Sequence, residues 1–147
     1  FAWGNNYKII PTLSNFVIEI EQHWVKSTGL DALFLCYQQD CFDFRIWTDR
    51  RLDFWGESIF PDLPRQEYLT DLVLPQIKSL SQVTSLMMIK KGAEIALYIN
   101  HAPVYYFAAP ENRSRKINSI QLRVGNASAA TPAEVHWDNL KVWVLNP

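Results

Sequence analysis

The sequence contains neither a long hydrophobic run nor an excess of charge of one sign. No apolar stretch approaches the roughly 18 residues that span a bilayer as a helix, so no transmembrane segment is predicted. Its 14 basic and 15 acidic residues give a net charge of −1, and the basic residues are scattered, mostly in pairs. Nucleic-acid binding needs a basic face that releases counterions from phosphates, so we expect no nucleic-acid partner.

The chain begins at Phe1 rather than methionine, and no signal-peptide pattern follows. We therefore expect a processed or excised piece of a longer protein, in which any targeting signal or anchor lies outside this sequence. Hydrophobic residues make up 48% and charged residues 20% of the chain, which is typical of a globular protein. Neither a repeat nor a linker interrupts the sequence, so residues 1–147 are predicted to form a single domain.

Helical periodicity is nearly absent too, and short alternating runs recur in its place. The run "FVIEIE" puts Phe16, Ile18 and Ile20 on one face of a strand. Further strands are predicted in "LDALFLCY", "CFDFRIW", "LDFWGESI", "SLMMIKK", "EIALYIN", "VYYFAA", "INSIQLRV" and "EVHWDNLKVWVL". A long crossing with several prolines follows "LDFWGESI", and a short helix is predicted within it around residues 66–72. The pattern indicates an all-β antiparallel sandwich or barrel of about ten strands.

The last predicted strand changes parity along its length. Val135 and Trp137 share one face, whereas Leu140, Val142 and Val144 fall on the opposite parity. Because side chains alternate strictly along a strand, keeping all five inward requires one extra residue. The sequence therefore predicts a β-bulge at Asp138 and Asn139.

At this point the sequence resembles a known family. "EIALYINHAPV" and "EVHWDNLKVW" are similar to the closing half of concanavalin A-like lectin/glucanase jelly-roll domains of the laminin-G-like type. "NFVIEIE" and "ALFLCYQQDCFDFRIW" are similar to their opening half, so the resemblance extends over most of the chain. It implies an antiparallel jelly-roll β-sandwich. One departure is His101, where the family usually has glycine, so Asn100 must adopt a left-handed conformation and His101 must follow it with some strain.

Both cysteines, Cys36 and Cys41, lie in one predicted hairpin. A zinc site needs further Cys or His ligands at regular spacing, and the three histidines are isolated, so no metal site is predicted. No histidine can be assigned as the partner of a nucleophilic cysteine either. Across a four-residue loop the two positions face each other, which favours a cross-strand disulfide over two reduced core cysteines.

The acidic residues do not form a recognisable catalytic pair. Glycosidases on this fold need an acid/base and a nucleophile about 5 Å apart. Glu19 and Glu21 share one strand, but neighbouring strands do not complete the set, so we predict no enzyme and interpret both as outward acids of a solvated strand. A structural calcium ion near Asp138 is the less favoured interpretation, because its carboxylate can instead hydrogen-bond the backbone of the bulge. No cofactor is predicted.

The candidate binding site lies on the outward side of the cysteine hairpin and of the strand that follows it. Inward Phe42, Phe44 and Phe54 leave the alternate residues outward. The outward set comprises Asp43, Arg45, Trp47, Asp53, Trp55 and Glu57. Tryptophan stacks on the C–H faces of pyranose rings and charged side chains fix the hydroxyls, so this set is predicted to bind a glycan. The alternative is that both tryptophans are buried beneath the crossing at residues 60–76 and the charges form ordinary cross-strand pairs.

Together these observations favour a non-catalytic, extracytoplasmic recognition module that is secreted, periplasmic or cell-surface. Its partner is expected to be a glycan or a protein surface, bound through one face of a sheet. A structural accessory subunit that docks onto a larger assembly is the first alternative, and a glycoside hydrolase-like enzyme is less favoured. Two N-glycosylation sequons, at Asn112 and Asn126, fall in predicted loops.

Overall fold

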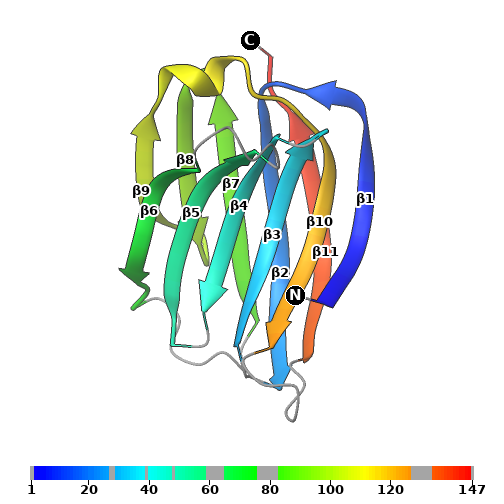
Figure 1. The fold of residues 1–147 in the computed structure, drawn as a ribbon, viewed down its shortest axis with the longest axis vertical. Helices are drawn as coiled ribbons and strands as arrows, with labels where there is room; N and C mark the ends of the chain where they lie inside the picture. The colour runs from blue at the N-terminus through cyan, green and yellow to red at the C-terminus, as the bar shows by residue number, and fades with distance from the viewer. Residues whose placement is uncertain are drawn as a thin grey trace.

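A computed structural model describes residues 2–26, 29–38, 40–47, 49–58, 65–75, 83–126 and 134–146. These residues form eleven strands in two antiparallel sheets that pack face to face (Figure 1). The predicted all-β jelly-roll sandwich is therefore confirmed. Among the described residues, no helix is long and apolar enough to cross a membrane.

One sheet has six strands and the other has five. The six-stranded sheet runs in the order β1 (Ala2–Leu13), β10 (Ile117–Asn126), β3 (Gly29–Tyr37), β4 (Asp40–Trp47), β5 (Arg51–Ser58) and β6 (Gln66–Val73). The five-stranded sheet runs in the order β11 (Glu134–Val144), β2 (Phe16–Lys26), β7 (Thr84–Lys91), β8 (Glu94–Ile99) and β9 (Ala102–Ala108). A short 3₁₀ helix, η1 (Pro110–Arg113), connects β9 to β10. In Figure 1, β1 and β11 lie at one side of the sandwich, and β6 and β9 lie at the other.

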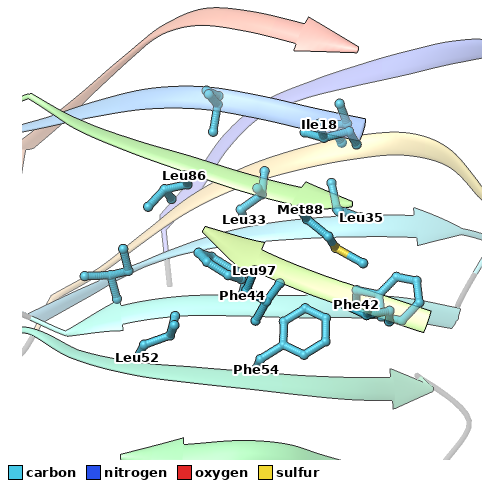
Figure 2. Close-up of a cluster of buried hydrophobic side chains, with 14 of the residues drawn as sticks. Ile18, Leu33, Leu35, Phe42, Phe44, Leu52, Phe54, Leu86, Met88 and Leu97 are labelled. Atoms are coloured by element: carbon cyan, nitrogen blue, oxygen red, sulfur yellow. The ribbon is translucent and has the colours of Figure 1, made fainter. Parts of the chain in front are cut away.

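The core fills the space between the two sheets, and it follows the predicted alternation. Phe42 and Phe44 of β4 and Phe54 of β5 point inward; the Phe54 ring stacks on Phe42 with centroids 5.8 Å apart and meets Phe44 edge-on at 6.0 Å. They meet Leu86 and Leu97 from the facing sheet (Figure 2). Burying each such side chain stabilises the fold by about 1.5–3 kcal/mol, so this layer fixes which residues of β4 and β5 face outward.

Two elements differ from the sequence-based expectation. Residues 66–72 were predicted to be helical, but they lie in strand β6, which pairs with β5. The pairing is irregular: its register shifts between Leu52 and Trp55, and Asp71 is left-handed, with φ of 58°. Strand β1 was not predicted, because its own register shifts against β10 interrupt the alternation that identifies a strand.

The predicted bulge in β11 is present. Register against β2 shifts between Asp138 and Lys141, and Asn139 is left-handed with φ of 52°. The Asn139 backbone N–H donates to Asp138 Oδ1 at 2.7 Å, as the hydrogen-bonding interpretation of Asp138 expected. Leu140 packs on the core, and register places Val142 opposite buried Ile18 and Val144 opposite buried Phe16, so the strand end points inward as predicted. Val144 is nevertheless 64% exposed. The physical reason is that β11 is the edge strand of its sheet.

One end of the sandwich is closed by polar side chains. The Lys90 ammonium is buried and donates to the carbonyls of Ser14, at 2.7 Å, and Gly92, at 3.2 Å. Burial, and secondarily the charge of Arg115, lower the pKa of Lys90 to about 8. The Arg115 guanidinium occupies the space that a Cβ on Gly56 would need, which explains why β5 has glycine there.

The same end buries one of the two sequons. Asn112 in η1 is fully buried, and its Oδ1 lies 3.3 Å from the Tyr68 hydroxyl. Burial is also the main cause that raises the pKa of Tyr68. Asn126 belongs to strand β10 rather than to a loop, and its side chain lies outside the described residues.

Candidate functional site

The candidate site is the outer face of the six-stranded sheet, meaning the face that points away from the core. Register pairs Asp43 of β4 with Trp55 of β5, and Arg45 with Asp53. Because Phe42, Phe44 and Phe54 point into the core, the intervening side chains point outward as predicted. Glu57 pairs with Cys41 in the backbone register, but its side chain lies outside the described residues.

The two aspartates of this set are buried. Asp43 is 0% exposed and Asp53 is 3% exposed. Asp43 accepts hydrogen bonds from Arg45 Nε at 2.7 Å and pairs with Arg45 Nη2 at 2.6 Å. Asp53 accepts one hydrogen bond from Trp47 Nε1 at 2.7 Å and another from the backbone N–H of Asp71 at 2.8 Å. The expectation of two exposed carboxylates is therefore wrong, and both are committed to contacts within the protein.

Arginine guanidinium groups lie against the rings of both tryptophans, but only Trp55 is buried. Trp55 is only 7% exposed, and the guanidinium carbons of Arg65 and Arg45 lie 3.8 and 4.4 Å from its ring centroid. Trp47 is half-buried, with the Arg51 guanidinium 5.3 Å from its ring centroid. The predicted platform of two exposed tryptophans is thus corrected for Trp55. Strand alternation identified the face, but it carries no information about Arg65, which comes from the crossing between β5 and β6.

These contacts belong to a row that crosses four strands. The row consists of Arg123 from β10, Phe34 from β3, Arg45 from β4, Trp55 from β5 and Arg65, and we call it the arginine–aromatic row. Arg123 lies 4.2 Å and Arg45 lies 6.0 Å from the Phe34 ring centroid. Each such cation–π contact is worth about 0.5–2 kcal/mol, depending on how dry it is. The row therefore fixes the relative positions of guanidinium groups across the outer face.

The predicted disulfide between Cys36 and Cys41 is confirmed, and it lies on this outer face. The two cysteines are directly opposite in the pairing of β3 with β4, with their Cα atoms 4.1 Å apart. They form a small buried cluster with Ala32 and Phe34, against which Trp47 packs. The outer face thus has an apolar cluster of its own. Phe34 belongs both to this cluster and to the arginine–aromatic row.

A groove opens on the same face, at its β1 edge. Its volume is about 580 Å³. The lining residues are Lys8, Ile9, Pro11 and Thr12 from β1, Gln38 from the turn after β3, and Asn118, Ser119 and Gln121 from β10. The sequence-based reading missed this groove because it missed β1. The alternation in "INSIQLRV" was available, since inward Ile120 and Leu122 leave Ser119 and Gln121 outward.

The acids considered for catalysis lie on the outer face of the other sheet. Glu19 Oε1 accepts a hydrogen bond from Ser85 Oγ at 3.0 Å and lies 3.7 Å from His101 Nε2. Glu21 Oε2 accepts a hydrogen bond from Asn139 Nδ2 at 2.7 Å. Both carboxylates therefore act as cross-strand acceptors. Among the described residues, no group of three or more His, Cys, Asp or Glu side chains is arranged to hold a metal ion.

Comparisons with known proteins identify the fold. No protein-family model matches the sequence, and no curated protein matches it. A tetrameric galectin from the ball sponge Cinachyrella sp. is 12% identical over 95% of this chain and 98% of the galectin, with a TM-score of 0.68. Chicken galectin 2 is 10% identical over 97% of this chain and 100% of its own, with a TM-score of 0.65.

A carbohydrate-binding module has the same architecture. CBM66 from Bacillus subtilis is 13% identical over 96% of this chain and 90% of the module, with a TM-score of 0.60. At such identities the likeness establishes the fold alone. The chain therefore has the two-sheet jelly-roll architecture of galectins and of this module.

Proposed function

We propose that residues 1–147 form a non-catalytic recognition domain that binds a glycan through the outer face of the six-stranded sheet. The observation that carries this proposal is that one face combines an open polar groove with the arginine–aromatic row. Sugar ligands need convergent hydrogen-bonding groups next to apolar surface, and this face has both. Galectins and a carbohydrate-binding module among the solved structures with this fold support the proposal. The proposal includes membership of this chain in the laminin-G-like type of concanavalin A-like domains.

Within this proposal the six outward residues have different roles. Arg45 and Trp47 are partly exposed and contact the ligand, and Glu57 remains a proposed contact. Asp43, Asp53 and Trp55 are buried and act as positioning residues, because they hold Arg45, Trp47 and the flanking arginines in place. An extracytoplasmic location is part of the proposal, since disulfides persist mainly in oxidising compartments.

A protein partner is the second candidate, and one surface favours it. Trp143 is 45% exposed near the end of β11, on the face of the strand opposite to that of exposed Val142 and Val144. Exposed aromatic residues on an edge strand commonly anchor a partner protein. An accessory subunit would use this edge, whereas a glycan-binding domain would use the outer face of the six-stranded sheet.

The test is a glycan array followed by mapping of the bound surface. We expect the 147-residue chain to retain at least one glycan on the array. Titration of ¹⁵N-labelled protein with that glycan should then shift amide resonances on β3, β4, β5 and β10. Shifts confined to β2, β7 and β8 would contradict the proposed face. An array with no retained glycan would contradict glycan binding itself.

A further inference from the structure

We propose that the groove between β1 and β10 is the primary sugar-contacting site, and that it takes a saccharide unit bearing a carboxylate. This inference rests on the proposed glycan binding and assigns its ligand class and its place on the sheet. It shifts the primary contact from the tryptophans to a part of the face that the sequence did not indicate.

The groove is continuous with the rest of the outer face. Backbone register places Lys8 opposite Ser119, and Ser119 opposite Cys36, so the groove borders the disulfide cluster directly. Gln121 lines the groove and accepts a hydrogen bond from Arg123 Nη2 at 2.8 Å. Arg123 is the first member of the arginine–aromatic row. An extended ligand seated in the groove would therefore reach the row without leaving the sheet.

Accessible side chains with unused hydrogen-bonding capacity distinguish the groove from the tryptophan region, where Trp55 Nε1 is buried and has no partner among the described residues. Lys8, Thr12, Gln38 and Asn118 make no side-chain hydrogen bond or ion pair with other residues in the described part of the chain. Around the tryptophans, by contrast, Trp47 Nε1 is committed to Asp53. Ligand binding gains most where the protein groups do not first have to break internal bonds. The groove meets that condition, and the tryptophan region does not.

The lining chemistry indicates the ligand. Carboxamides and hydroxyls both donate and accept, so Gln38, Asn118 and Thr12 match the hydroxyls of a sugar ring. Ile9 and Pro11 add an apolar wall for its C–H groups. Among the described residues that line the groove, Lys8 is the one that carries a charge, and an ammonium group suits an anionic ligand. The volume of about 580 Å³ lies in the range of small-ligand sites, and it accommodates one or two sugar units.

The experiment compares matched oligosaccharides on matched variants. The probes are tetrasaccharides that end in a uronic acid and their carboxyl-reduced counterparts, which end in the neutral hexose. The variants of the 147-residue chain are Lys8→Met, Lys8→Arg and the control Lys141→Met, which removes an exposed lysine from β11 on the other sheet. Affinities are measured by isothermal titration calorimetry, with melting curves to confirm that each variant is folded.

We expect the acidic probe to bind at least tenfold more tightly than the neutral one. Lys8→Met should abolish that preference by weakening binding of the acidic probe much more than binding of the neutral one. Lys8→Arg should retain most of the preference, and Lys141→Met should change neither affinity. If uronic-acid and neutral probes bind equally, or if Lys8→Met leaves the preference intact, the inference is wrong and glycan binding stands. If array glycans and probes all fail to bind, the proposed function is wrong as well.

Discussion

The indole Nε1 of Trp47 donates a 2.7 Å hydrogen bond to Oδ2 of Asp53, joining β4 to β5 across the outer face of the sheet. The other oxygen of Asp53 accepts the backbone N–H of Asp71, so one buried carboxylate connects three consecutive strands. A buried charge with two donors in fixed positions holds its neighbours more firmly than an exposed ion pair does. The acid that the sequence suggested as a ligand contact is therefore part of the framework that positions Trp47.

The first prediction concerns this carboxylate. Asp53→Ala leaves the Trp47 indole N–H and the Asp71 backbone N–H without their acceptor, and each orphaned donor costs about 1–3 kcal/mol. We expect a loss of about 3 kcal/mol in the free energy of unfolding, measured by urea denaturation. Asp53→Asn keeps an acceptor oxygen and should lose about half as much. An Asp53→Ala protein as stable as the parent would show that the hydrogen bonds contribute nothing.

The second prediction separates the buried tryptophan from an exposed one. Trp55→Ala removes a 7% exposed side chain stacked between arginines, and such core truncations cost about 3–5 kcal/mol. Trp143→Ala removes a 45% exposed ring and should change stability by no more than about 0.5 kcal/mol. Both free energies of unfolding are measured under the same conditions. Equal effects from the two substitutions would contradict the burial of Trp55.

Trp55 shows which features strand alternation predicts and which it does not. Alternation in "CFDFRIW" correctly placed Phe42 inward and Asp43 outward, because each strand has only two faces. Burial beneath the crossing at residues 60–76 was the alternative expectation, and it holds for Trp55, which Arg65 covers. Alternation could not decide between the two expectations, because that contact depends on how a long crossing returns to the sheet. Whether an outward residue is exposed depends on which distant segments cover it. The local sequence pattern carries no information about those segments.

Turn chemistry was predictable, and bulged strands were not. The departure at His101 led to the expectation of left-handed backbone, and the structure has φ of 52° at Asn100 and 65° at His101. A two-residue hairpin turn of this kind requires positive φ at both of its residues. A non-glycine residue at either position therefore predicts a left-handed, strained backbone there. Strand β1 has no comparable signal, because its register shifts break the alternation on which recognition depends.

The third prediction follows from that turn. A non-glycine residue in the left-handed region costs about 1 kcal/mol, and the Asn100 side chain compensates by accepting the Ser85 backbone N–H at 2.9 Å. Among the described residues His101 makes no such backbone bond, and its imidazole Nε2 lies 3.7 Å from Glu19 Oε1. We therefore expect His101→Gly to raise the free energy of unfolding by about 0.5–1 kcal/mol, measured by thermal and urea denaturation.

Asn100→Gly is the matched control for this turn. It relieves the same backbone strain but removes the hydrogen bond to Ser85, so it should be neutral or slightly destabilising. If His101→Gly destabilised the protein instead, the contact of the imidazole with Glu19 would outweigh the strain.

The fourth prediction concerns the sequon at Asn112. N-glycans attach to the side-chain nitrogen, and in this fold Asn112 Nδ2 is buried and has no hydrogen-bond partner among the described residues. Folded protein secreted from a glycosylating host should therefore carry no glycan at Asn112, as peptide mapping by mass spectrometry would show. Removing the sequon with Ser114→Ala should leave the intact mass pattern unchanged apart from the substitution. Monomeric, folded protein with an occupied Asn112 would contradict the placement of η1.

The last prediction is a dependence of stability on pH. Burial, followed by the charge of Arg115, lowers the pKa of Lys90 from 10.5 to about 8 in the folded state. Below about pH 8 the lysine is protonated in both states, and above about 10.5 it is neutral in both. Between these values the unfolded chain binds more protons, so the free energy of unfolding rises with pH. Tyr68 acts in the opposite direction above pH 10, because its raised pKa keeps the folded state protonated.

The informative range therefore lies between about pH 8 and pH 10, where Lys90 titrates and Tyr68 does not. Allowing for solvent screening at the end of the sandwich, we expect the free energy of unfolding to increase by about 1–2 kcal/mol across it. Urea denaturation at half-unit pH steps measures this slope. Lys90→Met keeps the length of the side chain but cannot titrate, so its slope over the same range should be close to zero. A parent protein whose stability does not rise between pH 8 and pH 10 would mean that the two carbonyl acceptors offset the effect of burial, so that the pKa of Lys90 is not lowered.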